Sequence, residues 1–366
     1  MASSSSSSSS SKPMNSGSIS APIHSSGDTN PENTAVAVPV GYDTDGDDVR
    51  NKKGKEIASC VARHNRRVSW GFVMEQGMRG SMEDNVAVCP AFMHLSCSDF
   101  GGCTAPDCKY SGEISPLHFF AVYDGHGGDQ VSNHCANGLH EILAEEWGRE
   151  VIADGWNEKW ELALRRAFER EDDILKDKNL APYSVGSTAV VVILSPCQII
   201  AANCGDSRAV LCRGKQAFPL TFDQKLERKD ELARIITGGG KIVNWGCMRV
   251  EGILCMTRAI GDHDWKEWVI SEPEVTFTTR SEEDECLILA SDGLWDVMSN
   301  DDIVKYAHNE LRRHRRLAKT GHISAHPAWH VSRQLLRKAF EAGSSDNIAV
   351  IVVDLKSPTI RHRHQL

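Results

Sequence analysis

The segment that most restricts the fold is an apolar run, 117–123, that ends in Asp-Gly-His-Gly-Gly at 124–128. Such a run is typical of a strand buried on both faces, and a buried strand holds its last residue rigidly. Glycines in the following loop let main-chain atoms approach an ion closely. Asp124 therefore suits a hard cation, and His126 can exchange a proton beside it. A plain strand-end turn is the alternative, because Asp and Gly are common turn residues.

Three further carboxylates stand where an apolar run meets a turn, namely Asp206, Asp292 and Asp346. Strand ends of stacked sheets can converge on one rim, so these side chains and Asp124 can share a site. Several oxygen ligands without a cluster of His or Cys favour Mg²⁺ or Mn²⁺ over zinc. Closely spaced carboxylates repel one another strongly unless cations neutralise them.

A loop at 79–84, between predicted strands at 69–75 and 85–89, adds two more groups. Glu83 offers a further oxygen ligand. Arg79 carries a planar, permanently charged guanidinium that matches a phosphoryl group. A surface ion pair between these two side chains is the alternative and the commoner fate of such a pair.

Seven segments of the chain, taken in order, resemble motifs of the metal-dependent Ser/Thr protein phosphatases of type 2C. The segments are 79–84, 124–128, 186–189, 202–209, 257–262, 291–297 and 345–347. They extend over roughly residues 69–355, so a chance match is a poor explanation.

The resemblance implies an α+β fold, a four-layer α/β/β/α sandwich with two central antiparallel β-sheets flanked by helices. Apolar positions at three- and four-residue spacing predict helices at 130–147 and 156–175. Two more helices are expected near the end of the chain, at 301–311 and 327–342.

The phosphatase domain is expected at 66–356. Residues 1–65 are rich in Ser, Gly, Pro, Asn and Asp, with few large apolar side chains. Such a composition cannot bury enough surface to offset the entropy of ordering, so a disordered tail is predicted there. A short basic tail is expected at 357–366.

The resemblance also implies a protein Ser/Thr phosphatase that holds two Mn²⁺ or Mg²⁺ ions, with positions for a third, weaker ion. The two main ions would be held by Glu83, Asp124, the carbonyl of Gly125, Asp292 and Asp346, and the additional ion by Asp206 and Asp296. Two such cations lower the pKa of a shared water and stabilise an in-line displacement. A hydroxide bound by both ions would attack phosphorus directly, without a phosphoenzyme.

Two side chains complete the implied catalytic set with Asp124. Arg79 would hold the non-bridging phosphate oxygens as charge develops. His126 would protonate the leaving Ser or Thr oxygen, a step typically worth about 10²–10⁴-fold.

A narrower resemblance is to the plant branch of this family that acts in abscisic-acid signalling. It implies a negative regulator whose substrates are stress-activated protein kinases and which hormone receptors bind. Trp245 matches a flap residue that inserts into the receptor, with Arg249 beside it; packing of this Trp against Arg249 or Trp265 is the alternative. Glu251 stands where several receptor-regulated members have an apolar residue, and burying its charge against a receptor would be costly.

Composition excludes other partners and indicates a compartment. The formal charge of −9 argues against general nucleic-acid binding, and no run approaches the ~20 apolar residues of a membrane span. Twelve scattered cysteines, several expected in apolar strands (Cys204, Cys255, Cys286), indicate the cytoplasm or nucleus. A basic cluster at 312–316 is either a nuclear signal or a solvated helix end.

A second group of cysteines, Cys97, Cys103 and Cys108, lies in a stretch rich in Gly and Asp. The spacing is irregular and contains no Cys-x2-Cys pair, so a flexible insertion is preferred to a zinc knuckle.

Two other functions stay open. The chain could be a catalytically weak binding protein that sequesters kinases or receptors, although a scaffold has no need for an array of mutually repelling carboxylates. It could also be a phosphohydrolase for small phosphate esters. Metal-dependent activity on a phosphopeptide distinguishes a protein phosphatase from the binding protein. A preference for the peptide over small phosphate esters distinguishes it from the other phosphohydrolase.

Overall fold

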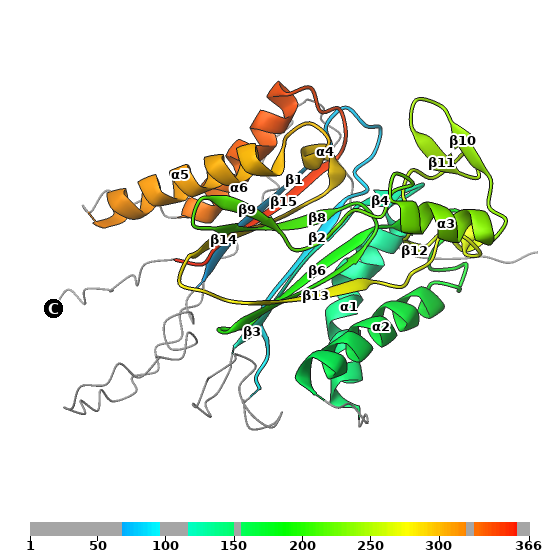
Figure 1. Cartoon of the computed structure of the whole chain (residues 1–366), viewed down its shortest axis with the longest axis horizontal. Coiled ribbons are helices and arrows are strands. Elements are labelled where there is room, and N and C mark those ends of the chain that lie inside the picture. Colours follow the sequence, from blue (N-terminus) through cyan, green and yellow to red (C-terminus); the bar gives the residue numbers. More distant parts are fainter. Residues whose placement is uncertain (1–67, 96–115, 150–154, 320–325, 357–366) are drawn as a thin grey trace, which may run out of the picture. The chain divides into compact units, whose positions relative to one another are not determined.

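Two five-stranded antiparallel β-sheets form the centre of the fold (Figure 1). The computed structural model describes residues 68–95, 116–149, 155–319 and 326–356. The predicted tails at 1–65 and 357–366 and the cysteines Cys97, Cys103 and Cys108 lie outside these ranges. Those expectations and the predicted domain boundaries therefore stay predictions.

The first sheet has the strand order β1-β15-β14-β8-β9, and the second has the order β13-β7-β6-β3-β2. The strands of the first are β1 (Ser69–Glu75), β8 (Arg208–Arg213), β9 (Gln216–Pro219), β14 (Asp284–Ala290) and β15 (Ile348–Asp354). Those of the second are β2 (Asn85–Met93), β3 (Leu117–Tyr123), β6 (Ala189–Leu194), β7 (Gln198–Cys204) and β13 (Glu274–Thr279). Every pairing within both sheets is antiparallel.

Strand β3 shows why these runs are apolar without interruption. Side chains alternate between the two faces of a strand. Phe120 and Val122 point into the apolar layer between the two sheets, whereas Phe119 and Tyr123 point into the layer beneath the helices. All four are completely buried. The strand therefore needs apolar residues at every position.

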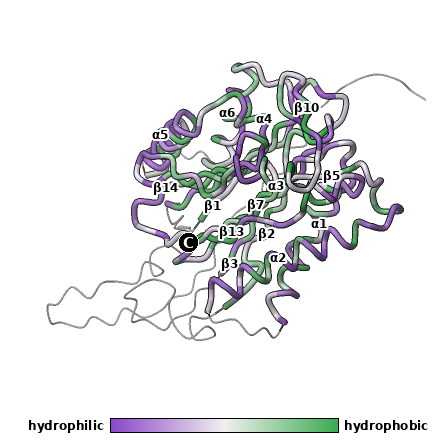
Figure 2. The backbone as a smooth tube through the Cα atoms, turned by 45° about the vertical axis from the view of Figure 1, so that its right-hand side comes forward, coloured by the Kyte–Doolittle hydropathy of each residue, from purple (hydrophilic) through white to green (hydrophobic). Residues whose placement is uncertain are grey.

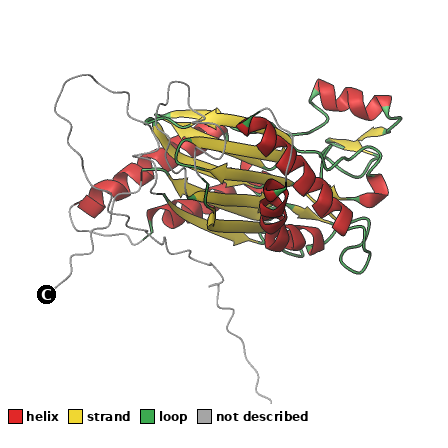
Figure 3. Ribbon diagram, turned by 90° about the horizontal axis from the view of Figure 1, so that it is seen from below, coloured by secondary structure: helices red, strands yellow, loops and turns green. Residues whose placement is uncertain are grey.

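Two pairs of helices cover the outer faces of the sheets. Helices α1 (Gln130–Gly148) and α2 (Trp156–Ile174) cover the second sheet, and α5 (Asn300–Lys319) and α6 (Pro327–Glu341) cover the first (Figures 1 and 3). The central strands are mostly hydrophobic and the helices carry hydrophilic residues at intervals, as the tube in Figure 2 shows. The order of layers is helix, sheet, sheet, helix, which confirms the predicted four-layer sandwich.

Smaller elements stand at one end of the sheets. A short sheet has the order β12-β5-β4, formed by β4 (Gly125–His126), β5 (Gly186–Ser187) and β12 (Ile260–Gly261). Helix α3 (Lys229–Thr237) leads to a hairpin of β10 (Ile242–Asn244) and β11 (Met248–Val250), and two short helical turns are η3 (His263–Trp265) and α4 (Asp292–Trp295). The hairpin projects beside α3, beyond the two large sheets (Figure 1).

One predicted helix differs clearly from the structure. Helix α5 continues to Lys319, whereas the sequence predicted an end at residue 311. The extension carries the basic cluster, and its side chains do not share one environment. His314 is buried, and Arg315 is only 13% exposed because it pairs with Glu285 and Asp354. The interpretation of 312–316 as a solvated helix end is therefore wrong for these two residues. Within the described residues, no helix is long and apolar enough to cross a membrane.

Candidate active site

Four strand ends meet at one rim of the sandwich and bring the predicted aspartates there. Asp124 follows β3 and Asp206 follows β7, both in the second sheet. Asp292 follows β14, and Asp346 precedes β15, which runs antiparallel to β14 in the first sheet. The carboxylate oxygens of Asp124, Asp206 and Asp292 lie within 4.8 Å of one another. The convergence predicted from the sequence thus appears for these three side chains.

The three clustered carboxylates disfavour one another's ionised form. Burial, together with the charges of neighbouring aspartates, holds the pKa of Asp124 and of Asp292 well above its usual range. Burial also raises the pKa of Asp206, although Lys225 opposes the shift. The Oδ1 atom of Asp206 is buried without a hydrogen-bond partner. Clustered carboxylate oxygens that repel one another are suited to hard cations, so this donor set fits Mg²⁺ or Mn²⁺.

The remaining predicted ligands surround the cluster. The charge of Asp346 acts on Asp124, and that of Asp296 acts on Asp292. Lys225 lies 3.2 Å from Asp206 and 3.4 Å from Asp296. The resemblance assigned Asp206 to a peripheral ion, yet its carboxylate lies as close to the cluster as the two main ligands do.

The backbone of Gly125 is held where only glycine fits. A Cβ atom there would lie 2.4 Å from the Glu83 carbonyl oxygen and 2.9 Å from Ser132 Oγ. The absence of a side chain thus lets the backbone after Asp124 pack directly against the loop that carries Glu83.

The loop that carries Arg79 and Glu83 is fixed by Asn347. The Oδ1 of Asn347 accepts a hydrogen bond from the Glu83 amide at 2.7 Å, and its Nδ2 donates to the Ser81 carbonyl at 2.9 Å. Arg79 pairs with Asp346 at 2.5 Å, and the Glu83 carboxylate accepts a hydrogen bond from Ser81 Oγ at 3.0 Å. The alternative of an ion pair between Arg79 and Glu83 is therefore wrong. Arg79 is 59% exposed at the rim, where it can reach a ligand.

His126 has a buried partner that the sequence did not assign. Its Nε2 lies 2.7 Å from Oδ2 of Asp262, a completely buried residue. Burial alone would lower the pKa of His126, but the hydrogen bond to Asp262 and the charge of that carboxylate outweigh burial. The pKa of the imidazole is therefore raised. The imidazole is thus stabilised in the protonated form that a general acid needs.

Gly186 leaves the room for this pair. A Cβ atom at Gly186 would lie 2.4 Å from Asp262 Oδ2 and 2.6 Å from His126 Nε2. Gly186 stands in β5, which pairs with β4 on one side and with β12 on the other. The short sheet therefore positions the acid and its partner together.

A second residue missed by sequence reasoning is Asp84. Its side chain is buried and accepts a hydrogen bond from Ser291 Oγ at 2.7 Å. Burial and the charge of Asp292 raise the pKa of Asp84 to about 7, although the hydrogen bond from Ser291 opposes the shift. Its place directly after Glu83 was the only available signal, and the contact with Ser291 spans 207 positions.

The hairpin β10–β11 carries the predicted partner-binding residues. The side chain of Trp245 is 72% exposed, so it is not packed against Arg249 or Trp265. Arg249 donates a hydrogen bond to the Ile253 carbonyl at 2.5 Å. The carboxylate of Glu251 accepts one from the Lys241 amide at 2.6 Å. Glu251, which departs from the family pattern, therefore has its charged group hydrogen-bonded to the backbone at the base of the hairpin.

A cysteine pair also lies on this hairpin. Cys255 was expected in an apolar strand, but it lies in the loop after β11, with its Sγ 3.0 Å from Sγ of Cys247. Cys204 and Cys286 do lie in strands and are buried, as predicted.

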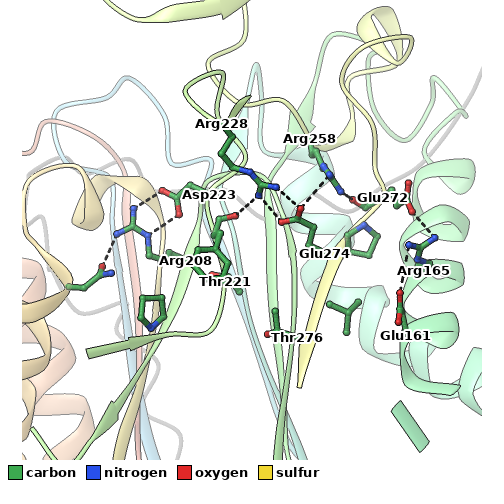
Figure 4. A pocket seen from close by; sticks show the side chains of 15 residues that line it. Glu161, Arg165, Arg208, Thr221, Asp223, Arg228, Arg258, Glu272, Glu274 and Thr276 are labelled. Carbon is green, nitrogen blue, oxygen red and sulfur yellow. Dashed lines mark hydrogen bonds and ion pairs between the residues drawn. The ribbon is translucent and has the colours of Figure 1, made fainter. Parts of the chain in front are cut away.

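A charged cavity lies apart from the carboxylate cluster. Its volume is about 980 Å³, and none of its lining residues is a predicted metal ligand (Figure 4). Its four arginines each pair with a carboxylate: Arg165 with Glu272, Arg208 with Asp223, Arg228 with Glu274, and Arg258 with Glu231 and Glu274. Because these charges are balanced, the cavity does not select an anion.

A stacked-sheet sandwich that gathers carboxylates at one rim, beside an arginine and a half-buried histidine, has the parts of a metal-assisted phosphohydrolase. Comparison with known proteins agrees: residues 69–348 match the family described as protein phosphatase 2C. The chain belongs to this family and is a metal-dependent protein Ser/Thr phosphatase.

Relatives in plants cover most of the chain. Protein phosphatase 2C 56 of Arabidopsis thaliana is 42% identical over 341 residues, which are 88% of this chain and 76% of the relative. Protein phosphatase 2C 77 of the same plant is 44% identical over 298 residues, with 76% and 69% covered.

Solved structures share the fold. A sex-determining protein of C. elegans has a TM-score of 0.62 and 25% identity, with 80% of this chain and 65% of that chain covered. A serine-threonine phosphatase 2C from Toxoplasma gondii has a TM-score of 0.59 and 21% identity, with 78% and 94% covered.

Proposed function

We propose that this phosphatase hydrolyses phosphoserine and phosphothreonine with two Mn²⁺ or Mg²⁺ ions, and a third at a weaker position. The observation that carries the proposal is the group of three carboxylates within 4.8 Å at the rim. The main ions are assigned to Glu83, Asp124, Gly125, Asp292 and Asp346, and the weaker one to Asp206 and Asp296. When bound, such ions activate a water molecule and neutralise charge during an in-line displacement.

The chain's own residues bind the phosphate and supply a proton. Arg79 is exposed at the rim and is oriented by its ion pair with Asp346. Its guanidinium holds the non-bridging oxygens, whose charge is largest in the transition state. His126 protonates the departing Ser or Thr oxygen, and Asp262, which contacts Nε2, keeps the imidazole in its protonated form at rest. A serine or threonine alkoxide is a poor leaving group, so its departure depends on this proton.

The direct test is phosphate release from a phosphothreonine peptide, with Mn²⁺ or Mg²⁺ against EDTA. We expect the wild-type protein to release phosphate with metal, to lose this activity in EDTA, and the Asp124→Asn variant to lack it. Asp173→Asn is the matched control, because the side chain of Asp173 is exposed near the end of α2 and pairs with Lys176. An inactive protein that is folded and supplied with metal would favour the binding-protein alternative. Faster turnover of small phosphate esters than of the peptide would favour the other alternative.

The pathway proposal is a negative regulator of stress-kinase signalling under abscisic acid, in the cytoplasm, the nucleus or both. Its supports are the plant relatives at 42–44% identity and the exposed Trp245 on the projecting hairpin. An exposed aromatic side chain is a typical anchor for a protein partner. The proposed partners are activated kinases as substrates and a hormone receptor that covers the hairpin at Trp245 and Arg249.

Receptor control is tested with Trp245→Ala. The variant should keep its phosphatase activity, because Trp245 is not among the rim residues, and should resist inhibition by hormone-loaded receptor. Phe222→Ala is the matched control, since Phe222 is a 62% exposed aromatic residue outside the hairpin. Undiminished inhibition of Trp245→Ala would remove this residue from the proposal.

A further inference from the structure

A buried histidine on helix α5 has no partner for either ring nitrogen. The side chain of His314 is 7% exposed, and both Nδ1 and Nε2 lack a hydrogen bond. A neutral imidazole has one donor and one acceptor nitrogen, and buried polar groups are nearly always paired. By contrast, the buried His308 on the same helix contacts Cys212 and Arg312. The isolation of His314 therefore calls for an explanation.

Two other metal-ligating side chains face this imidazole. Glu310 precedes His314 by four residues, so both lie on one face of α5. His330 comes from the neighbouring helix α6, and its ring centroid lies 4.8 Å from that of His314. One ligand atom from each of the three residues lies within 4.8 Å of the other two. The three side chains thus converge from two helices on one point.

We propose that Glu310, His314 and His330 form a zinc site between α5 and α6. Two imidazoles and one carboxylate are a typical ligand set for Zn²⁺, and a fourth, open position takes water or another donor. Mg²⁺ and Ca²⁺ prefer oxygen ligands throughout, so the site differs in chemistry from the carboxylate cluster at the rim. A bound zinc ion gives a ring nitrogen of His314 the partner that the protein does not supply.

The surrounding charges permit this ligation. Burial lowers the pKa of His314, so its imidazole is neutral and offers a lone pair. Glu310 contacts Arg313 at 3.2 Å, but the arginine side chain is 66% exposed. An ion pair with one exposed partner contributes little and can be exchanged for a metal bond. Among the carboxylate clusters of the described residues, the group Asp230, Glu231 and Glu274 is instead neutralised by arginines.

The two helices that carry the site pack on the first sheet, which also positions Asp292 and Asp346. Helix α5 begins at Asn300, and a rise of about 1.5 Å per residue places His314 roughly 20 Å along its axis. Helix α6 ends shortly before Asp346, and both helices pack on the first sheet. Zinc would therefore join the two helices of this outer layer and stabilise it, without entering the reaction.

The first experiment separates this site from the rim. The full chain carrying Asp124→Asn and Asp292→Asn, which weaken the rim cluster, is loaded with Zn²⁺, passed through gel filtration and analysed for bound metal. Co²⁺ is loaded in parallel, because tetrahedral histidine ligation gives intense visible absorption and octahedral oxygen ligation does not. We expect one zinc per chain and the tetrahedral cobalt spectrum. Absence of both would overturn the proposal.

Three further substitutions in that background decide the ligands. His330→Gln and Glu310→Gln change half-buried residues, and each should lose the zinc, the cobalt bands and the rise in melting temperature on zinc addition. His134→Gln is the matched control, because His134 is also half-buried and next to a carboxylate, Glu171, and it should keep all three. Retention of zinc and the cobalt spectrum by His330→Gln would overturn the assignment.

Discussion

Asp262→Asn tests whether the buried carboxylate beside His126 keeps the general acid protonated. Asp262 has a φ of 51°, in the left-handed region that Asn tolerates, so the substitution removes the charge and keeps the backbone. Asp264→Asn is the matched control, because Asp264 is exposed two residues further on. The imidazole of His126 itself is unchanged in both variants.

The magnitude follows from the lost hydrogen bond. A bond between an imidazolium and a carboxylate contributes about 1.5–3 kcal/mol. Since about 1.4 kcal/mol corresponds to a factor of ten, the protonated imidazole becomes about ten- to a hundredfold scarcer at a pH above the pKa of His126 in the wild type. The 2.7 Å distance and the complete burial of Asp262 favour the upper part of this range. We expect kcat on a phosphothreonine peptide to fall by that factor.

The assay compares the peptide with p-nitrophenyl phosphate over a range of pH. Nitrophenolate leaves without a proton, so kcat on this ester should change little. Asp262 raises the pKa of His126, so the protonated acid is present below that pKa and is lost as pH rises through it. In the variant the alkaline limb of the peptide profile should move to lower pH. Equal losses on both substrates, or an unmoved limb, would refute the role of Asp262.

Two other substitutions have specific expected outcomes, each with a control variant. Gly186→Ala should displace the histidine–aspartate pair and lower peptide activity about as much as Asp262→Asn, whereas Gly148→Ala, which meets no atom within 4 Å, should keep full activity. Arg315→Ala leaves a buried carboxylate uncompensated and should lower the unfolding free energy by about 3–5 kcal/mol. Arg316→Ala is the control, because Arg316 is the exposed neighbour, and it should change the unfolding free energy by less than about 0.5 kcal/mol. Urea denaturation measures both variants.

The sequence predicted best where burial dictates every position. Strands β1 and β3 begin and end at the predicted residues, because each lies in a sheet whose apolar pattern has sharp ends. The same reasoning located the rim, since Asp124, Asp206 and Asp292 all follow buried strands. Local pattern and tertiary position agree at these places.

Contacts between distant segments lay beyond such reasoning. The pair of His126 and Asp262 spans 136 positions, and it depends on the space above Gly186. The matched segment 257–262 ends at Asp262, but it does not give the residue's role, because that role comes from the partner that the short sheet brings to it. The length of α5 was missed for a similar reason. A run of charged residues at a helix end predicts a solvated segment, but Arg315 forms an ion pair with Asp354 on β15.

A final prediction concerns His118, a buried histidine at the start of β3, the opposite end of the strand from Asp124. Burial, aided by the charge of Arg280, lowers the pKa of His118 to about 4 from its ordinary 6.5. Its Nδ1 accepts a hydrogen bond from the Ala91 amide at 3.3 Å, which only the unprotonated nitrogen can do. The imidazole is therefore neutral in the folded protein and protonated in the unfolded chain at intermediate pH.

The sign of the effect on stability follows from this difference. Between about pH 6.5 and pH 4 the unfolded chain binds one more proton at His118, so the free energy of unfolding falls as pH falls. Each pH unit costs about 1.4 kcal/mol, and the whole interval about 3 kcal/mol. His118→Gln keeps an acceptor for Ala91 and does not titrate. The stability difference between wild type and variant, measured by urea denaturation at several pH values, should therefore shift by about 3 kcal/mol across this interval. A constant difference would show that His118 is protonated in the folded protein as readily as in the unfolded chain.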